Sequence, residues 1–265
     1  MKLVEPEVFL VASPKIDYVA MAEYLREVGG ESWLERLDTG ALDGELNDPQ
    51  NLAEFAGRAC YRSWEPGLNP NVVRIRTDQD AYLRNILASA HGSVLEHVSF
   101  SFVLHNVSRV LTHELVRHRS GVAVSQESMR FVRLQELPFW FPEWAQQDTE
   151  LMARATGMLQ QMEEFQHWMA DHFELDAEGR EFSDKKHKTS FMRRFAPDGV
   201  ATGLVWTANV RALRHTIEAR TAHGAEEEIR LLFDKIGRLM QKEAPALFSD
   251  YEIEDGTWVP KWRKV

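Results

Sequence analysis

The sequence has little cysteine and no long hydrophobic run. Its 265 residues include a single cysteine, Cys60, which excludes an internal disulfide, a zinc ribbon and a cysteine-held iron–sulfur cluster. One thiol favours a reducing compartment, so we expect a cytoplasmic protein. No apolar stretch approaches the roughly 20 residues that a membrane span needs. The short apolar run near the start is flanked by acids, unlike a secretory signal peptide. We therefore expect no membrane partner.

Several motifs of catalysis and nucleotide binding are also missing. The sequence has no G-x-G-x-x-G and no P-loop, so neither of the two common glycine-rich loops is available to bind a nucleotide. It has no G-x-S-x-G nucleophile elbow. The H-E-L-V segment that begins at His113 starts like a zincin helix, but Arg117 occupies the second ligand position and would repel zinc. His91 and His97 alone are a weak metal signal, and we predict no metal site.

The chain is acidic but carries local basic clusters. Lys and Arg number 31 against 41 Asp and Glu, which gives a net charge of −10 and makes nucleic acid an unexpected partner. Four arginine-centred clusters interrupt this background, at residues 117–119, 125–130, 193–194 and 211–220. Because arginine binds phosphate through a bidentate fork, these clusters suggest localised binding of polyanionic small molecules such as nucleotides. The alternative is that they are solvated helix ends and polar turns.

Hydrophobic periodicity predicts a helix-rich chain with a few strands. In the first half we expect a buried strand at 8–12 and a half-buried strand at 98–104. Helices are predicted at 17–28, 52–62, 80–90 and 108–119. An exposed loop is predicted at 38–50. Cys60 is expected to be a buried helix residue, so thiol catalysis is not indicated.

In the second half, alternation predicts a strand at 129–134. A long helix is predicted from Asp148 or Thr149 to about residue 173, with an apolar stripe that we expect to pack in the core. Residues 176–188 are expected to be a charged connection, followed by helices at 209–220 and 225–243. No repeat or linker is visible. We predict one α+β domain over residues 1–265 with a mainly antiparallel sheet.

The first two clusters have the most informative spacing. Arg109, His113 and Arg117 are four residues apart, so they would share one stripe of the predicted 108–119 helix. Arg117 and its near neighbour Arg119 would point in different directions and could reach two anionic groups. Residues 125–130 form a turn rich in hydroxyl and amide groups, which could offer donors to a phosphate that Arg130 neutralises.

Several separated motifs, in order along residues 53–235, resemble the flavin-dependent thymidylate synthases. H-G-S-V-L-E-H at 91–97 is similar to the family's H-x-[ST]-P-F-E-H, and F-S-F follows at 100–102. V-S-R at 107–109, His113 and L-V-R-H-R at 115–119 are similar to its V-S-R and R-H-R helix. S-Q-E-S-M-R at 125–130, W-T-A-N-V-R-A-L at 206–213, Arg220 and E-I-R at 228–230 resemble the remaining elements.

The resemblance implies a homotetramer with active sites between subunits, and it implies FAD, dUMP, methylenetetrahydrofolate and NADPH. In that family NADPH reduces the flavin, the folate supplies one carbon, and the flavin hydride completes the methyl group on C5 of dUMP. No enzyme cysteine attacks the pyrimidine, which agrees with a chain that has only one.

The resemblance also implies roles for individual residues. The implied FAD-binding residues are His91, Ser93, Arg117, His118, Arg119, Gln126, Asn209, Arg211 and His215. The implied dUMP-binding residues are Glu114, Arg117, Glu127, Ser128, Arg130, Arg193 and Arg220. Arg220 is the catalytic candidate, because a cation beside the uracil ring would stabilise negative charge that develops there.

The sequence departs from the family pattern at several positions. One extra residue lies between Arg119 and Ser128. Glu114 and Glu226 stand where glutamine is usual, and an ionised glutamate at position 114 would repel phosphate. Phe131 replaces a tyrosine. Two other functions therefore stay open: a related flavoprotein acting on another pyrimidine nucleotide, and a nucleotide-binding homologue without turnover.

Overall fold

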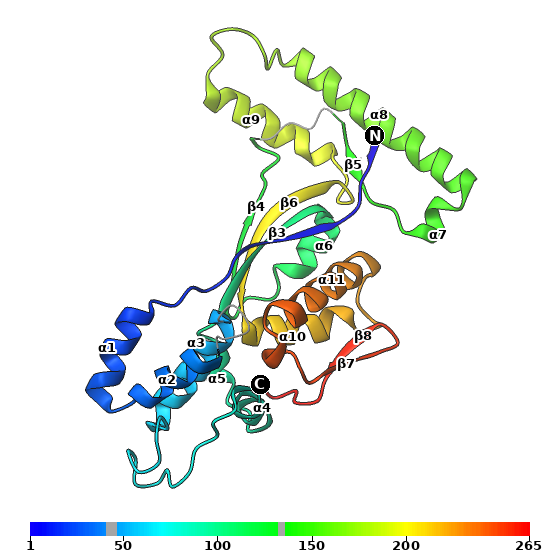
Figure 1. Ribbon diagram of the computed structural model, residues 1–265. Coiled ribbons are helices and arrows are strands. Elements are labelled where there is room, and N and C mark those ends of the chain that lie inside the picture. The colour runs from blue at the N-terminus through cyan, green and yellow to red at the C-terminus, as the bar shows by residue number, and fades with distance from the viewer. Residues whose placement is uncertain (41–46, 132–135) are drawn as a thin grey trace.

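The protein is described by a computed structural model that covers residues 1–40, 47–131 and 136–265. Its centre is a four-stranded sheet in the order β2-β3-β6-β4 (Figure 1), and it is antiparallel, as predicted. The strands are β2 (Glu7–Ala12), β3 (Ser99–Ser108), β6 (Ala201–Asn209) and β4 (Val122–Gln126). The β3–β6 pair is central and runs from Ser99 opposite Asn209 to Ser108 opposite Ala201, with a register shift between Leu104 and Val107.

One face of this sheet forms the main core. Alternate residues of β3 and β6, such as Phe102 and Trp206, are fully buried, which is the period-2 pattern of a strand covered on one side. Two helices cover that face, α10 (Val210–Thr221) and α11 (Glu227–Glu243), and contribute buried residues such as Ile217 and Phe233 (Figure 1). Both helices were predicted. Helix α10 begins directly after β6 ends at Asn209, so it carries candidate site residues such as Arg211 and Arg220 away from this end of the sheet.

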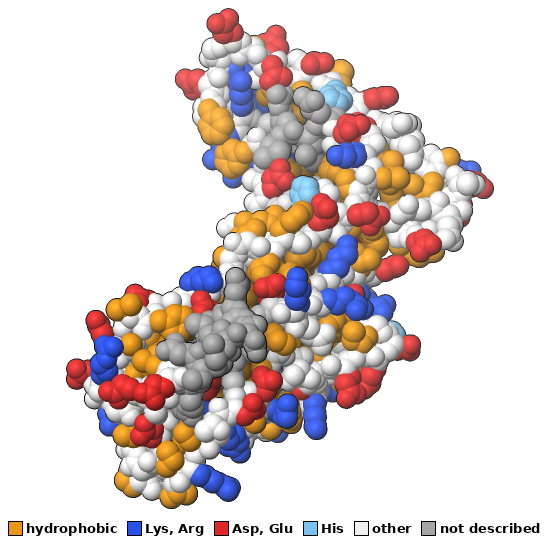
Figure 2. Space-filling model, in the orientation of Figure 1, with side chains coloured by type: hydrophobic (Ala, Val, Ile, Leu, Met, Phe, Trp, Pro, Cys, Tyr) orange, Lys and Arg blue, Asp and Glu red, His pale blue; other side chains and the backbone are white. Residues whose placement is uncertain are grey.

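The opposite face of the sheet is largely uncovered. Phe9, Val103 and Val205 lie side by side on it, and Phe9 and Val205 are 49% and 42% exposed. The strand predicted at 8–12 is confirmed as β2, but the expectation that it is buried is wrong. β2 is an edge strand whose outward side chains meet no second layer in the described residues. Hydrophobic side chains gather across the narrow middle of the molecule, between two wider lobes (Figure 2).

In its described residues the first lobe contains five helices: α1 (Tyr18–Val28), α2 (Glu31–Gly40), α3 (Asp48–Tyr61), α4 (Gln79–Ala88) and α5 (Gly92–Leu95). As predicted, α1 starts at the N-cap Asp17 and ends at Gly29, whose φ of 72° suits glycine. The loop predicted at 38–50 is wrong at both ends, where α2 and α3 extend; residues 41–46 lie outside the described residues. Cys60 lies on α3 but is exposed rather than buried, because it points away from the core.

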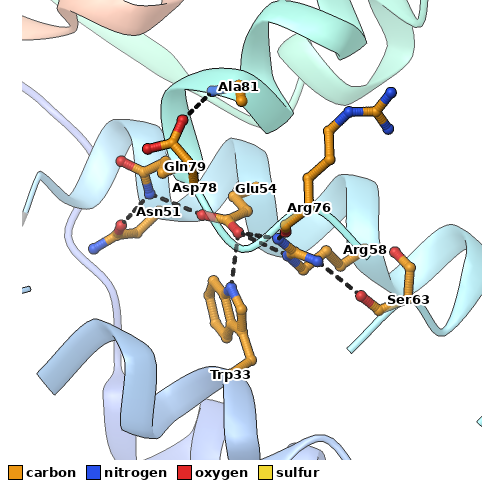
Figure 3. A network of polar contacts seen from close by, with 9 residues as sticks. All are labelled: Trp33, Asn51, Glu54, Arg58, Ser63, Arg76, Asp78, Gln79 and Ala81. Atoms are coloured by element: carbon orange, nitrogen blue, oxygen red, sulfur yellow. Dashed lines mark hydrogen bonds and ion pairs between the residues drawn. The ribbon is translucent and has the colours of Figure 1, made fainter. Parts of the chain in front are cut away.

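A buried polar network ties this lobe together (Figure 3). The Arg58 guanidinium donates to Glu54 Oε1 at 2.7 Å, and to the backbone oxygens of Ser63 at 2.8 Å and Arg76 at 2.6 Å. Gln79 Nε2 donates to the other Glu54 oxygen at 2.9 Å. Because Arg58 is fully buried, these bonds fix the path of the loop at 62–78 against α3.

The second lobe is built on a long helix. Its elements are β5 (Pro138–Phe139), α7 (Glu143–Gln146), α8 (Thr149–His172), α9 (Phe182–Met192) and the 3-10 helix η2 (Arg193–Phe195), with β1 (Lys2–Leu3) pairing parallel to β5. α8 was predicted, but its apolar stripe is not all core. Leu159 and Met169 are buried, whereas Met158 and Phe165 are 60% and 39% exposed, because few elements pack against this helix. The connection predicted at 176–188 is helical from Phe182.

Two predicted boundaries near the site are also wrong. Helix α6 (Arg109–Leu115) ends four residues before Arg119, because the chain must turn to enter β4 at Val122. Arg117 therefore lies beyond the helix and does not continue the stripe of Arg109 and His113. Residues 129–131, predicted as strand, form a turn after β4, and 132–135 lie outside the described residues.

The chain closes with the 3-10 helix η3 (Pro245–Leu247) and a hairpin of β7 (Tyr251–Glu254) and β8 (Thr257–Pro260). The hairpin packs on α10 through Trp258, whose backbone N–H donates to Thr221 Oγ1 at 2.9 Å. Among the residues described, no helix is long and apolar enough to cross a bilayer.

Candidate active site

Arg220, near the end of α10, stands at the centre of a half-buried polar cluster. Its Nε donates to His118 Nε2 at 2.7 Å, and its two terminal nitrogens donate to Glu114, to Oε2 at 2.7 Å and to the backbone oxygen at 3.0 Å. A guanidinium has more N–H donors than these three bonds use. Arg220 is therefore held firmly and keeps donors for a ligand.

His118 is electrically neutral in this cluster. Burial, then the charge of Arg220 and of His215, lower the pKa of His118 to about 4. Its Nε2 accepts the bond from Arg220, so we assign the proton of the neutral ring to Nδ1. His118 thus fixes Arg220 with one nitrogen and presents a donor with the other.

The two glutamates that depart from the family pattern both have partners. The charge of Glu114 is offset by Arg220, so the repulsion of phosphate expected from the sequence is reduced. Glu226 caps α11, accepting from the backbone N–H groups of Glu228 and Ile229 at 2.9 and 3.3 Å. Burial raises the pKa of Glu226, although these bonds oppose the rise. Neither substitution leaves an isolated buried charge.

A second group of polar residues lies after β4. Ser125 and Gln126 belong to the strand itself, and the turn begins at Glu127, later than predicted. Within the turn, the Arg130 N–H donates to Ser128 Oγ at 3.3 Å, and Arg130 Nε donates to Ser190 Oγ at 3.0 Å. The structure thus joins the predicted Ser128 and Arg130 with hydroxyl groups from α9.

Arg109 is a candidate that the sequence reasoning missed. Its terminal nitrogen donates to the backbone oxygen of Glu127 at 3.1 Å, while its Nε is buried with no partner in the described residues. Burial lowers the pKa of Arg109 and the nearby Arg193 lowers it further, whereas Glu127 and Asp198 raise it. An unused buried donor beside a second arginine, Arg193, indicates an anion site. This arginine belongs to the V-S-R motif, but the motif alone indicates no role for it.

Helix α6 sets the distance between these two groups. Arg109 begins it next to the turn, and Glu114 near its end holds Arg220. At about 1.5 Å per residue, the two positions are about 7.5 Å apart along the axis. This spacing is comparable to that between the phosphate and the base of a nucleotide.

A cavity of about 510 Å³ opens at the start of α10. The residues that line it are Glu96, Ser120, Gly121, Asn209, Arg211, Ala212, His215, Arg263, Lys264 and Val265. Asn209 caps α10, accepting from the Ala212 N–H at 2.9 Å, and Arg211 pairs with Glu96 at 2.5 Å. The edge-to-face contact between His215 and His118, at 5.8 Å, links the cavity to the Arg220 cluster.

Two features of the cavity wall bear on what can enter it. Gly121 has φ of 69°, and a Cβ there would lie 2.4 Å from Asn209 Nδ2, so only glycine fits. Residues 263–265 come from the end of the chain, where no motif could have indicated them. Their cations join those predicted from the sequence.

Other predicted flavin residues lie elsewhere. His91 caps the start of α5 and stacks on Tyr61, with ring centres 6.2 Å apart, in a separate cavity. Ser93 is exposed on the same short helix. Arg117 and Arg119 are exposed after α6, and neither forms an ion pair within the described part of the chain. Within one chain, the structure therefore joins only part of the predicted set.

Comparisons with known proteins give the family. Residues 42–246 match the family model described as thymidylate synthase complementing protein. A flavin-dependent thymidylate synthase of Mycolicibacterium gilvum is 34% identical over 254 residues, covering 94% of this chain and 95% of the relative. One from Mycobacterium tuberculosis is 37% identical, covering 78% and 83%. The chain belongs to the flavin-dependent thymidylate synthase family, as its motifs predicted.

Solved structures confirm the mixed helix-and-sheet fold. A UMP/dUMP methylase, PolB from Streptomyces cacaoi, bound with 5-Br dUMP, superposes with a TM-score of 0.64 at 16% identity and covers 94% of this chain and 96% of that one. The same protein bound with 5-Br UMP gives a TM-score of 0.60 at 17% identity, covering 94% and 95%. At this identity the likeness supports the fold and no more.

Proposed function

We propose that this protein makes dTMP from dUMP by reductive methylation, with methylenetetrahydrofolate as the carbon donor and FAD reduced by NADPH as the hydride donor. The observation that carries the proposal is Arg220, a half-buried cation with free donors beside a neutral imidazole. Such a group can polarise a pyrimidine ring without a covalent nucleophile. The exposed Cys60 takes no part.

The cavity at the start of α10 fits the dinucleotide part of FAD. Arg211, Arg263 and Lys264 supply cations, Asn209 supplies an amide, and Gly121 leaves room for a close approach. Bound FAD would supply the hydride that completes the methyl group. We assign Asn209, Arg211, His215 and His118 to FAD binding. The further predicted FAD contacts are His91, Ser93, Arg117, Arg119 and Gln126.

Helix α6 positions the substrate dUMP. Ser128, Arg130 and Arg193, joined by Arg109, would bind the phosphate, where the buried Nε of Arg109 gains a partner. Glu127 and Glu114 hold Arg109 and Arg220 at the two ends of the helix. The free donors of Arg220 would then face a carbonyl oxygen of the uracil ring. Charge developing on that oxygen is stabilised by a cation that is already oriented, which activates C5.

We also propose that the single domain of residues 1–265 assembles as a homotetramer in the cytoplasm, with active sites between subunits. The uncovered sheet face with Phe9 and Val205, and the exposed Met158 and Phe165 of α8, are apolar surfaces that a second copy would bury. The exposed Arg117 and Arg119 could then complete a site that one chain leaves open.

The decisive experiment measures release of tritium from dUMP labelled at C5. We expect release and formation of dTMP when FAD, methylenetetrahydrofolate and NADPH are all present, and none when any is omitted. Parallel reactions with labelled UMP test the alternative pyrimidine substrate. Release of tritium from UMP, in the presence of methylenetetrahydrofolate and reduced flavin, without release from dUMP would refute the proposal in favour of that alternative. A protein that binds nucleotide without turning over either substrate would be the non-catalytic homologue.

A further inference from the structure

A second cavity, of about 330 Å³, is lined in part by His91, the residue that precedes α5. Its wall comes from the end of α3, the loop at 62–78, the middle of α4, and His91. It is lined by three arginines, Arg58, Arg74 and Arg76, and by no Asp or Glu among the described residues. In a chain with a net charge of −10, a cavity with this lining indicates an anionic ligand.

The three arginines have different tasks. Arg58 is fully buried and uses its guanidinium on Glu54 and on the backbone oxygens of Ser63 and Arg76, so it anchors the loop. Figure 3 shows the Arg76 side chain pointing away from that network while its carbonyl meets Arg58. Arg74 and Arg76 are exposed, and neither has an ion-pair partner in the part of the chain that the structure describes. Two free guanidinium groups are thus presented on a fixed loop.

An aromatic surface lies in the same cavity. The rings of Tyr61 and His91 stack at 26° with centres 6.2 Å apart, and Tyr61 is 53% exposed. An exposed flat ring is a surface on which a heteroaromatic ligand can lie. The lining therefore combines binding groups for a planar ring with binding groups for an anion.

The cavity also adjoins the proposed flavin site. His91 starts α5 on this side, whereas Glu96 ends it in the other cavity, and a Cβ on Gly92 would lie 2.7 Å from Arg211 Nε. His91 of one cavity and Arg211 of the other therefore approach each other through Gly92. A ligand against His91 would lie close to a flavin bound at Arg211.

We propose that this cavity binds the anionic tail of a planar cosubstrate through Arg74 and Arg76, with part of that ligand against Tyr61 and His91. The identity of the ligand rests on the proposed function: the anion is either the 2′-phosphate of NADPH or the glutamate carboxylates of the folate. Both offer acceptor oxygens that arginine binds through paired, charge-assisted hydrogen bonds.

The test is equilibrium binding of NADP⁺, NAD⁺ and folate to the purified FAD-loaded protein, without turnover. The variant replaces both groups, Arg74→Ala with Arg76→Ala. The matched control is Arg84→Ala, an exposed arginine on α4 outside the cavity lining. We expect the double variant to weaken one ligand by about tenfold or more, with the affinities for FAD and dUMP and the unfolding midpoint unchanged.

The ligands distinguish the two sources of the anion. Weaker binding of NADP⁺ with unchanged binding of NAD⁺ assigns the arginines to the 2′-phosphate, and weaker binding of folate assigns them to its carboxylates. Unchanged binding of NADP⁺ and folate would overturn the proposal, as would an equal loss in Arg84→Ala or a wild-type protein that binds neither. Because no turnover is measured, failure of the tritium-release experiment would not decide this one.

Discussion

Two arginine–glutamate pairs among the described residues have the same 2.7 Å separation and different surroundings. Arg58 and Glu54 have 0% and 4% of their side chains exposed, whereas Arg220 and Glu114 have 18% and 29%. Arg58 donates hydrogen bonds to Glu54 and to two backbone oxygens. Arg220 has donors left and a neutral histidine beside it.

The difference shows how one kind of contact can serve structure or function. A buried pair that is fully hydrogen-bonded resists disruption, because removing either partner leaves the other charge uncompensated. A pair at the edge of a cavity contributes less to folding but keeps a cation aimed at a ligand. The two pairs should therefore respond to mutation in opposite ways: the first mainly in stability, the second mainly in turnover.

The largest effect is expected for Arg58→Ala. It leaves Glu54 buried without a cation and frees the loop at 62–78, so we expect a loss of about 3–5 kcal/mol in the free energy of unfolding. Chemical denaturation followed by circular dichroism measures it. Combining Arg58→Ala with Glu54→Leu should recover part of the loss, since no charge is then buried alone. A loss below about 1 kcal/mol in the single variant would contradict the structural role.

Arg220→Ala should show the opposite behaviour. We expect turnover to fall by about 100-fold or more, because a preoriented cation at the uracil ring is lost, while the flavin absorbance and the unfolding midpoint change little. Steady-state kinetics and flavin titration measure these effects. Arg238→Ala, which removes an exposed pair with Asp234, is the control and should leave both properties unchanged. Turnover within a few-fold of wild type would refute the role of Arg220.

Glu228 sharpens the comparison, because it is a buried glutamate whose described hydrogen bonds come from Ser108 rather than from an arginine. It accepts from the Ser108 backbone N–H at 2.7 Å and from the Ser108 hydroxyl. Burial raises the pKa of Glu228 to about 7. Between pH 4.5 and 7 the unfolded chain therefore holds fewer protons than the native one, and stability falls as pH rises through this window.

Comparison with Glu228→Gln isolates this effect. The stabilisation from protonated Glu228 is present below about pH 4.5 and is lost above about pH 7, by on the order of 3 kcal/mol in total. His118, with its lowered pKa, has the opposite sign between about pH 6.5 and 4 but is common to both proteins. Denaturation curves at several pH values should therefore show a difference that changes with pH. A constant difference would disprove the raised pKa.

The sequence predicted the parts of the fold that are decided locally. The helix at 17–28 has both a cap and a glycine stop, and the helices at 209–220 and 225–243 have clear apolar faces. The stripe of α8 was misjudged because periodicity shows that a face is apolar, not that another element covers it. The strand expected at 129–134 alternates, but β6 pairs with 122–126 instead, and that choice depends on partners far along the chain.

The candidate site was predictable where charge stood out against an acidic background. The clusters around Arg130 and Arg220 are found in that way. The pairing of Glu114 with Arg220, the cap made by Glu226 and the cavity residues at 263–265 could not be predicted, because each depends on packing between distant segments. Arg109 belongs to the V-S-R motif, but its proposed role in anion binding is indicated only by its burial beside Glu127 and Arg193.

The short helix α5 is flanked by one lining residue of each cavity, His91 before it and Glu96 after it, and this has a thermodynamic consequence. Any ligand that shifts α5 on one side changes the shape of the site on the other. Linkage requires such an effect to be reciprocal: if occupancy of the Arg74 cavity strengthens binding at Arg211 by some factor, occupancy at Arg211 strengthens binding at Arg74 by the same factor. Gly92 lies against Arg211 with no room for a side chain between them. A shift of this four-residue helix would therefore couple the ligand affinities of the two sites.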